Sequence, residues 1–279
     1  MGSGQKTWFI TGCSTGFGRV LATHVLRRGD RVALTARNPE TLSDLVDAFP
    51  SQARAYRLDV SNHEEMMRVV EDVEYDFAPI DYLVNNAGFV AVGTIEELRP
   101  ADYRKVFETN FFGALELIRT VLPFMRQRRS GTIINMSALG GIVANAGLGY
   151  YCASKHALEA VSEALSEEVA PLNIRVLIVE PGQFRTEAMA KRFEALQIPD
   201  YEDVLRPLRQ RFAELDGKQP GDPDRAALAI MAALHANPPT LRLPLGRDSL
   251  TRIRGKIARL TQEMDRWEPV ALATDFQTD

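Results

Sequence analysis

Short apolar runs alternate with longer amphipathic stretches over the first two thirds of this 279-residue chain. The runs are nearly continuous in Val, Ile and Leu, which is typical of parallel strands whose two faces are both covered by helices. The alternation therefore predicts an α/β, doubly wound, Rossmann-type fold over residues 1–182. The predicted strands are 7–11, 31–36, 54–58, 81–84, 131–136 and 174–179, and the predicted helices are 16–28, 39–49, 62–75, 99–128 and 150–171.

The pattern becomes looser after residue 182, and we assign the whole chain, 1–279, to a single domain. Residues 183–223 carry apolar side chains scattered among charges, which suits either a substrate lid or a segment that packs against the core. Residues 224–279 are predicted to be a C-terminal helical extension. Its predicted elements are a helix at 224–235, a possible strand at 241–243 and a helix at 247–267.

The charge balance argues against a nucleic-acid binder. The chain carries 33 Lys and Arg against 37 Asp and Glu, a formal net charge of -4, whereas phosphate binding calls for a basic surplus. With 45% hydrophobic and 25% charged residues, the composition is that of a soluble globular domain.

The cysteines and the N-terminal sequence indicate in which cellular compartment the protein is expected. Cys13 and Cys152 match no disulfide framework and no zinc spacing, which is typical of a reducing environment. The longest apolar run, 226–234, is far shorter than the roughly 20 residues of a membrane span, and the start of the chain lacks the pattern of a secretory signal. We therefore expect a cytoplasmic protein without a membrane span.

A glycine-rich turn, TGCSTGFG (11–18), follows the first predicted strand and opens the first helix. Gly12 allows a tight turn, Gly16 allows the backbone to approach a diphosphate, and Gly18 allows the helix to pack closely on the sheet. The free N–H groups at the helix start favour an anion. At this position in an alternating chain, the turn predicts a dinucleotide site.

The same turn also fits the nucleophile elbow of a serine hydrolase, G-x-S-x-G, at Gly12-Cys13-Ser14-Thr15-Gly16. That alternative needs an oxyanion donor from a preceding strand and loop, and only a short tail precedes residue 7. Its histidine would have to be His235, which lies in an apolar helical pattern where a packed or capping histidine is expected. The hydrolase is therefore a distant alternative.

The end of the second predicted strand, Thr35-Ala36-Arg37-Asn38, indicates which dinucleotide is bound. An NAD site presents an acid to the adenosine ribose here, and this chain has none. The Arg37 guanidinium suits a phosphate monoester, so we expect it to hold the 2′-phosphate of NADP(H), with Ser14 as a second contact. The alternative is an ordinary solvated arginine.

Tyr151 and Lys155 lie four residues apart in a predicted helix, so both side chains emerge on one face. An ammonium beside a phenol favours the phenolate, and we expect Lys155 to lower the pKa of Tyr151 towards the range useful for acid/base chemistry. Tyr150 is assigned to packing.

Segments in chain order resemble the motifs of the short-chain dehydrogenase/reductase family, of the NADP-preferring type with a YxxxK pair and a TGxxxGxG turn. The resemblance covers residues 6 to about 186, and the ordered set is highly specific. The segments are TGCSTGFG (11–18), LDV (58–60), NNAG (85–88), TNFFG (109–113), INMS (134–137), YCASK (151–155) and PGQFRT (181–186).

The resemblance implies a sheet of about seven strands in the order 3-2-1-4-5-6-7 and a role for each matched residue. Tyr151 would protonate the carbonyl oxygen, Lys155 would also hold the nicotinamide ribose, and Asn110 would anchor a water. From the residues alone, Asn110 could be a satisfied polar group in a helix, and Asp59 could cap the next helix. The cofactor-binding residues implied are Gly12, Ser14, Thr15, Gly16, Phe17, Gly18, Arg37, Asp59, Val60, Asn86, Ala87, Gly88, Tyr151, Lys155, Pro181, Gly182 and Thr186.

One position departs from the family pattern. The catalytic serine normally lies thirteen residues before the tyrosine, where this chain has Ala138, and Ser137 is one residue further away. Three explanations are open. The loop 139–149 is one residue longer than in the family pattern and Ser137 acts as the catalytic serine; or an engineered change has replaced the serine by alanine; or catalysis runs weakly without that hydroxyl. Losing one such donor costs about 100- to 1,000-fold in turnover.

The sequence thus predicts an NADP(H)-dependent oxidoreductase acting on a carbonyl or secondary alcohol of a fairly apolar small molecule. The catalytic residues are Tyr151, Lys155, Asn110 and Ser137, and no metal is expected. An NADP-binding sensor with little turnover is the alternative, which Ala138 supports. The helices at 101–128 and 151–170 resemble those that form contacts between family subunits, so we expect a homodimer or homotetramer.

Overall fold

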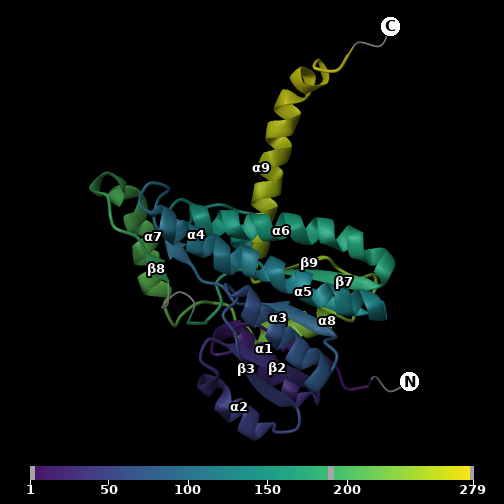
Figure 1. Cartoon of the computed structure of the whole chain (residues 1–279). Helices are drawn as coiled ribbons and strands as arrows, with labels where there is room; N and C mark the ends of the chain where they lie inside the picture. The colour runs from purple at the N-terminus through teal and green to yellow at the C-terminus, as the bar shows by residue number, and fades with distance from the viewer. Residues whose placement is uncertain (1–3, 188–191, 277–279) are drawn as a thin grey trace.

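The computed structural model describes residues 4–187 and 192–276 and is built around a parallel seven-stranded sheet (Figure 1). The strand order is β3-β2-β1-β4-β6-β7-β9, which confirms the predicted order 3-2-1-4-5-6-7. The strands are β1 (Thr7–Ile10), β2 (Arg31–Ala36), β3 (Ala53–Arg57), β4 (Tyr82–Asn85), β6 (Gly131–Met136), β7 (Ile174–Pro181) and β9 (Arg242–Leu245).

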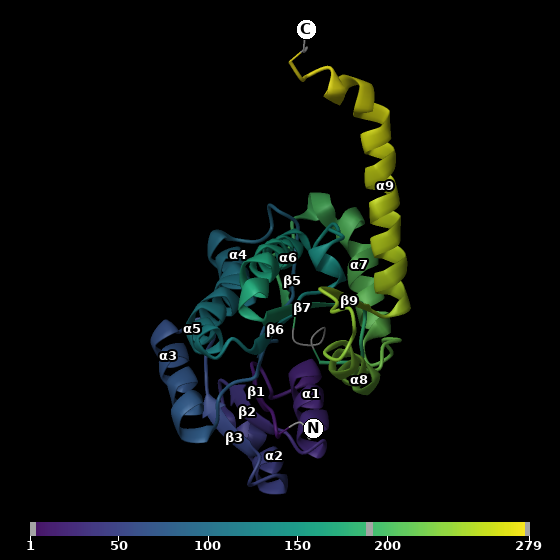
Figure 2. The same ribbon diagram turned by 90° about the vertical axis from the view of Figure 1, so that its right-hand side faces the viewer.

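Helices cover both faces of the sheet, as the continuous apolar strands require (Figure 2). One buried cluster joins the sheet to α1, α2 and α8, and a second joins its other face to α3, α5 and α6. The α/β doubly wound class is therefore confirmed. These helices are α1 (Gly16–Arg27), α2 (Ser43–Ala48), α3 (His63–Asp72), α5 (Gly113–Arg128), α6 (Gly149–Val169) and α8 (Pro223–Ala233).

The helix predicted at 99–128 is interrupted. It consists of α4 (Pro100–Phe107), a π-helical turn at Glu108–Phe112 and then α5. Single π turns inside helices are rare and occur often at functional sites. Here the turn contains Asn110, one of the predicted site residues.

Residues 183–223 contain a helix that the sequence did not predict, α7 (Glu202–Leu215), and a short strand, β8 (Phe193–Glu194), which pairs with β5 (Ala91–Val92). Pro207 lies inside α7 and weakened the helical signal. Part of the predicted lid, residues 188–191, lies outside the described residues.

The predicted C-terminal elements are present with shifted ends. The strand expected at 241–243 is β9, at the edge of the main sheet, and the last helix is α9 (Arg247–Leu272), which continues beyond the predicted end at 267. Within residues 4–187 and 192–276, no helix combines the length and apolar character needed to cross a bilayer.

Candidate active site

A cavity of about 920 Å³ lies at the carboxyl edge of the sheet, where ligands bind in doubly wound folds. Its size falls within the range of about 300–1,000 Å³ typical of small-molecule sites. It brings together nearly all the residues predicted from the sequence. Those that line it are Gly12, Ser14, Thr15, Gly16, Phe17, Arg37, Asp59, Val60, Asn86, Ala87, Gly88, Ser137, Tyr151, Lys155, Pro181, Gly182 and Thr186.

The glycine turn has the geometry that its spacing predicts. Gly12 and Gly16 adopt φ angles of +69° and +62°, which side chains with a Cβ rarely do. Gly18 does not line the cavity; a Cβ there would lie 2.6 Å from the Gly12 carbonyl oxygen, so only glycine allows this close approach. The turn therefore places the first residues of α1, Gly16 and Phe17, in the cavity wall.

Thr11 ties the glycine turn to the loop after β4. Its hydroxyl oxygen accepts hydrogen bonds from the backbone N–H groups of Asn86 and Ala87, both at 2.8 Å. The Asn86 side chain donates in return to the carbonyl oxygens of Thr11 and Gly12, at 2.8 and 3.2 Å. Asn86 thus holds the turn in shape. Thr11 was not among the site residues predicted from the sequence, although its position directly before Gly12 in the glycine-rich motif could have indicated this role.

Arg37 directly follows the last residue of β2. It is exposed to solvent and forms part of the cavity wall. Near it, Asp59 accepts hydrogen bonds from the Ser61 N–H at 3.0 Å and hydroxyl at 2.7 Å. Burial acts to raise the pKa of Asp59, but the Ser61 hydrogen bonds and the Arg37 charge outweigh it and lower that pKa. The carboxylate is therefore ionised at neutral pH.

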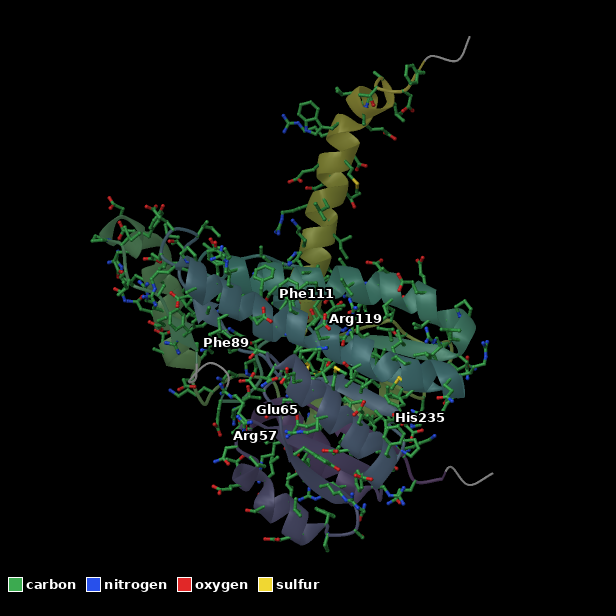
Figure 3. The ribbon with its side chains drawn as sticks, viewed as in Figure 1. Arg57, Glu65, Phe89, Phe111, Arg119 and His235 are labelled. Atoms are coloured by element: carbon green, nitrogen blue, oxygen red, sulfur yellow. The ribbon has the colours of Figure 1, made fainter. Side chains whose placement is uncertain are left out.

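Asp59 does not cap the next helix. The cap of α3 is Asn62, whose side chain accepts from the Glu65 N–H at 3.1 Å. The Asp59 backbone N–H donates to Glu65 at 2.6 Å, and the same buried carboxylate pairs with Arg57 (Figure 3). Glu65 thereby fixes the stretch that carries Asp59.

Tyr151 and Lys155 both reach the cavity from the start of α6. The Lys155 ammonium donates to the Met136 carbonyl oxygen at 2.7 Å, and burial lowers the pKa of Lys155 to about 8, an effect that Glu159 opposes. Burial raises the pKa of Tyr151, which is the opposite of the direction expected from Lys155. The expectation that the pKa of Tyr151 is lowered was wrong, because desolvation of the phenol dominates.

Asn110 lies beside Lys155, behind the cavity wall. Its amide donates to the Phe89 carbonyl at 3.0 Å and to the Ser154 hydroxyl at 3.2 Å, and its oxygen accepts from the Phe89 N–H at 3.0 Å. A Cβ on Gly88 would lie 3.0 Å from Asn110 Oδ1 and 3.6 Å from Lys155 Nζ. The π turn therefore brings Asn110 to the same point as the lysine.

Ser137 and Ala138 follow β6 and both line the cavity. The Ser137 hydroxyl is directed to the back of the site: a Cβ on Gly141 would touch it and would lie 2.9 Å from Glu159 Oε1. Gly140, one residue earlier, faces the Tyr151 ring instead, since a Cβ added to Gly140 would lie 3.1 Å from Tyr151 Cε1. The Ser137 hydroxyl is thus beside Glu159, and Ala138 presents a methyl group to the cavity.

The far end of the cavity is apolar and is covered by residues beyond 192. Phe193, Phe212 and Leu215 line it, and Phe212 packs in one cluster with Tyr151 and Val90. Arg104 and Lys105 of α4 also line the cavity and were not singled out from the sequence. No motif marks them, since they are two among many surface cations on helices.

The serine-hydrolase arrangement is not formed. His235 lies within 3.3 Å of Arg28, just beyond the C-terminal end of α1, whereas Ser14 lies before its start. Figure 3 shows His235 on the opposite side of the molecule from Phe89, which lines the cavity. In the described part of the chain no histidine lines the cavity, and no His, Cys, Asp and Glu cluster could hold a metal ion.

Curated relatives match the chain over most of its length. Oxidoreductase BOA17 of Botryotinia fuckeliana is 33% identical over 276 residues, covering 96% of this chain and 99% of its own. The 3-ketodihydrosphingosine reductase of Bacteroides thetaiotaomicron is 34% identical over 241 residues, covering 85% of this chain and 86% of its own.

Solved structures agree with the fold. A short-chain dehydrogenase from Streptomyces avermitilis has a TM-score of 0.92 and 42% identity, over 98% of this chain and 100% of its own. A Burkholderia cenocepacia relative in complex with NADP has a TM-score of 0.75 and 25% identity, over 94% and 97%. One from Burkholderia phymatum, in complex with NAD, matches in fold with a TM-score of 0.79 at 22% identity, over 99% and 98%.

The family profile described as short chain dehydrogenase matches residues 6–197, which include the glycine turn, Tyr151 and Lys155. Together with relatives more than 30% identical over nearly the whole chain, this match establishes that the protein belongs to the short-chain dehydrogenase/reductase family of oxidoreductases.

Proposed function

We propose that this protein is an NADP(H)-dependent oxidoreductase that moves hydride between nicotinamide and a carbonyl or secondary alcohol of a fairly apolar small molecule. The observation that supports this most strongly is a single cavity with Arg37 and the start of α1 at one end and Tyr151 and Lys155 at the other. An oxidoreductase of this kind needs three groups along the bound dinucleotide. They are a cation or acid at the adenosine ribose, an anion site at the diphosphate and an acid/base group beside the nicotinamide.

The residues present fit such a cofactor. The start of α1 suits the diphosphate, and Gly16 lies opposite Thr186, with 3.6 Å from a Cβ to the threonine Cβ. Arg37 and Ser14 would hold the 2′-phosphate, and Asp59 with Val60 the adenine. Asn86, Ala87 and Gly88 would lie on the adenosine side and at the floor of the site. Lys155 and Thr186 would hold the nicotinamide end, and Pro181 and Gly182 line the same cavity at the carboxyl edge of the sheet.

When bound, NADPH supplies the hydride for the substrate carbonyl carbon. Tyr151 then donates its phenolic proton to the carbonyl oxygen, and in the oxidative direction the phenolate takes the proton of the alcohol. The raised pKa of Tyr151 keeps the phenol protonated at neutral pH, as an acid must be. The Lys155 ammonium, with its pKa of about 8, stabilises the phenolate that forms.

The proposed lid over the substrate is the segment 183–223, of which residues 188–191 lie outside the described part of the chain. Phe193, Phe212 and Leu215 give this end of the cavity an apolar wall beside Tyr151, which suits a substrate with a hydrophobic body. The similarity to a 3-ketodihydrosphingosine reductase supports the same substrate class, a ketone or alcohol on an apolar chain.

A panel assay tests this proposal. We expect absorbance at 340 nm to fall when NADPH is mixed with the protein and at least one member of a set of long-chain and cyclic ketones and aldehydes. Fluorescence titration of NADPH in parallel reports binding. Absence of both binding and oxidation would overturn the proposal.

The second candidate, an NADP-binding sensor, rests on Ala138. The methyl group leaves Tyr151 without the hydroxyl partner that the family normally provides, and the Ser137 hydroxyl is directed to Glu159. Binding of NADPH without oxidation by any member of the panel would favour the sensor over the enzyme.

A further inference from the structure

The last helix, α9, leaves the body of the protein and extends away from it (Figures 1 and 2). Every described residue from 257 to 276 is exposed. Large apolar side chains are among them: Ile257 is 55% exposed, Leu260 41%, Met264 63% and Trp267 58%. A helix of this length without tertiary contacts is only marginally stable in water, so its apolar side chains call for a partner.

The base of α9 is fixed to the sheet, close to the cavity. The Asp248 carboxylate accepts from the Gln183 N–H at 2.8 Å, and the Ser249 hydroxyl donates to the Glu180 carbonyl at 2.8 Å. Ser249 is fully buried. The direction in which the exposed part projects is therefore set by the folded body, and the surface it presents is preformed.

The apolar residues of α9 follow a heptad repeat. Leu250, Ile257, Met264 and Ala271 are spaced by seven, and Ile253, Leu260 and Trp267 fall between them at the 3-4 spacing of a coiled-coil seam. Pro269 lies on the opposite side from this seam, at the position furthest from a partner helix. The spacing predicts a second helix packed along the seam.

The charges of α9 are divided along its length. Residues 247–259 carry five cations and one acid, a net charge of +4, whereas residues 260–272 carry three acids and one cation, a net charge of -2. A second copy of the same helix running in the opposite direction would place its acidic half beside the basic half of the first. Such a pair is self-complementary and closes with two-fold symmetry.

We propose that α9 pairs antiparallel with α9 of a second copy of this chain. With the two-fold axis at the level of Gln262, Leu260 packs against Met264 of the copy and Ile257 against Trp267. Arg254 and Glu268 then flank the seam as partners, twice by symmetry. Glu263 meets its own copy near the axis, where Arg259 and Arg266 lie one turn away on either side.

Two other arrangements fit the charges less well. A parallel pair would set Glu263 against Glu268 of the copy on both sides of the seam, without an opposite charge. A lipid surface favours Lys and Arg along the whole polar face, whereas the most exposed apolar half of α9 is acidic. This interface is separate from the family-type contacts expected on α4, α5 and α6.

Mass measurement of the full chain tests the pairing. Light scattering should give the Leu260→Ser/Trp267→Ser variant half the mass of the wild type, while the matched Ala258→Ser/Gln262→Ser control on the outer faces keeps the wild-type mass. A wild type of 31.1 kDa at tens of micromolar, or equal masses for wild type and seam variant, would contradict the pairing. So would binding of the wild type to phosphatidylserine vesicles that the seam variant loses without any change in mass.

Disulfide crosslinking tests the direction. Leu260→Cys and Met264→Cys chains, one of them tagged, should form a mixed disulfide dimer when oxidised together and little when oxidised alone, because only unlike positions meet in the proposed register. The native Cys13 and Cys152 are buried and do not interfere. Self-crosslinking of each variant alone would indicate a parallel pair and overturn the proposal.

Charge reversal tests the flanking contact. Arg254→Glu should weaken dimerisation several-fold, and the double variant Arg254→Glu/Glu268→Arg should restore it, since each chain then carries the reversed pair. A double variant that dimerises more weakly than the single one would contradict the proposed register.

Discussion

The two ends of the cavity are built in different ways. At the cofactor end, backbone groups and short side chains are held by a dense set of hydrogen bonds, such as those between Thr11, Asn86 and the glycine turn. At the substrate end, side chains such as Phe193 and Phe212 come from segments added outside the sheet. In the function proposed above, the sheet edge would therefore fix the chemistry and the added segments would select the substrate.

The largest expected effect is that of Tyr151→Phe, at the boundary between the two ends. Removing the proton donor should lower kcat by at least about 100- to 10,000-fold and leave NADPH affinity unchanged. Steady-state kinetics with fluorescence titration provide the measurement. Tyr150→Phe is the matched control, since Tyr150 stacks on Tyr103 and donates to the Ile95 carbonyl. Comparable rates in Tyr151→Phe would remove the proposed acid.

Ala138→Ser adds a hydroxyl to the cavity wall at the position of the family's usual catalytic serine and should raise kcat, by up to about 100- to 1,000-fold if that donor limits the rate. Ala153→Ser, on the exposed side of α6, is the control. An unchanged kcat would mean that the site does not depend on a hydroxyl at position 138.

The lowered pKa of the buried Lys155 should make the stability of the fold depend on pH. Its value is about 8 in the fold against 10.5 for the free side chain, so between these pH values the unfolded chain binds more protons and stability rises with pH. Relative to Lys155→Met, the wild type should gain up to about 3 kcal/mol across this window. Urea unfolding of both proteins from pH 8 to 10.5 checks it; a constant difference would show that burial does not shift this lysine.

Arg37→Asp should reverse the preference between NADPH and NADH. Losing a charge-assisted hydrogen bond costs about 1.5–3 kcal/mol, or roughly 10- to 100-fold in NADPH affinity. Arg27→Asp, at the far end of α1, makes the same charge change away from the cavity. If the ratio of kcat/KM for the two cofactors stays the same in Arg37→Asp, the 2′-phosphate assignment is wrong.

At the substrate end, Phe212→Leu should raise KM for the most apolar substrates by about tenfold, with little effect on NADPH binding. Phe124→Leu, where the ring packs edge-on against Tyr75 away from the cavity, is the control. A change in NADPH affinity with no change in KM would place Phe212 at the wrong end.

The residues that the structure brings together around the glycine turn, Tyr151 and Lys155 could be predicted from the sequence because the constraints on them are local. A positive φ at Gly12 and the close approach at Gly18 can be met only by glycine, and Tyr151 and Lys155 are related by one helical turn. The direction of the Tyr151 pKa shift could not be predicted locally, since it depends on burial by Phe212 and Val90, which are distant in sequence.

The substrate end was harder to predict because its contacts join residues that are distant in the sequence. Leu205, Leu208 and Phe212 are spaced as on one face of a helix, but Pro207 between them argued against α7. The buried carboxylate of Glu159 behind Ser137 left no sequence signal, because a lone acid on a helix is normally solvated. Which hydroxyl faces the site depends on how the loop after β6 turns.

A crystal structure of the protein with NADP tests the central claim most directly. The account predicts the 2′-phosphate beside Arg37, the diphosphate at the start of α1, and the nicotinamide ring within reach of Tyr151 and Lys155. A dinucleotide bound elsewhere, or a nicotinamide out of reach of the Tyr151 hydroxyl, would contradict it.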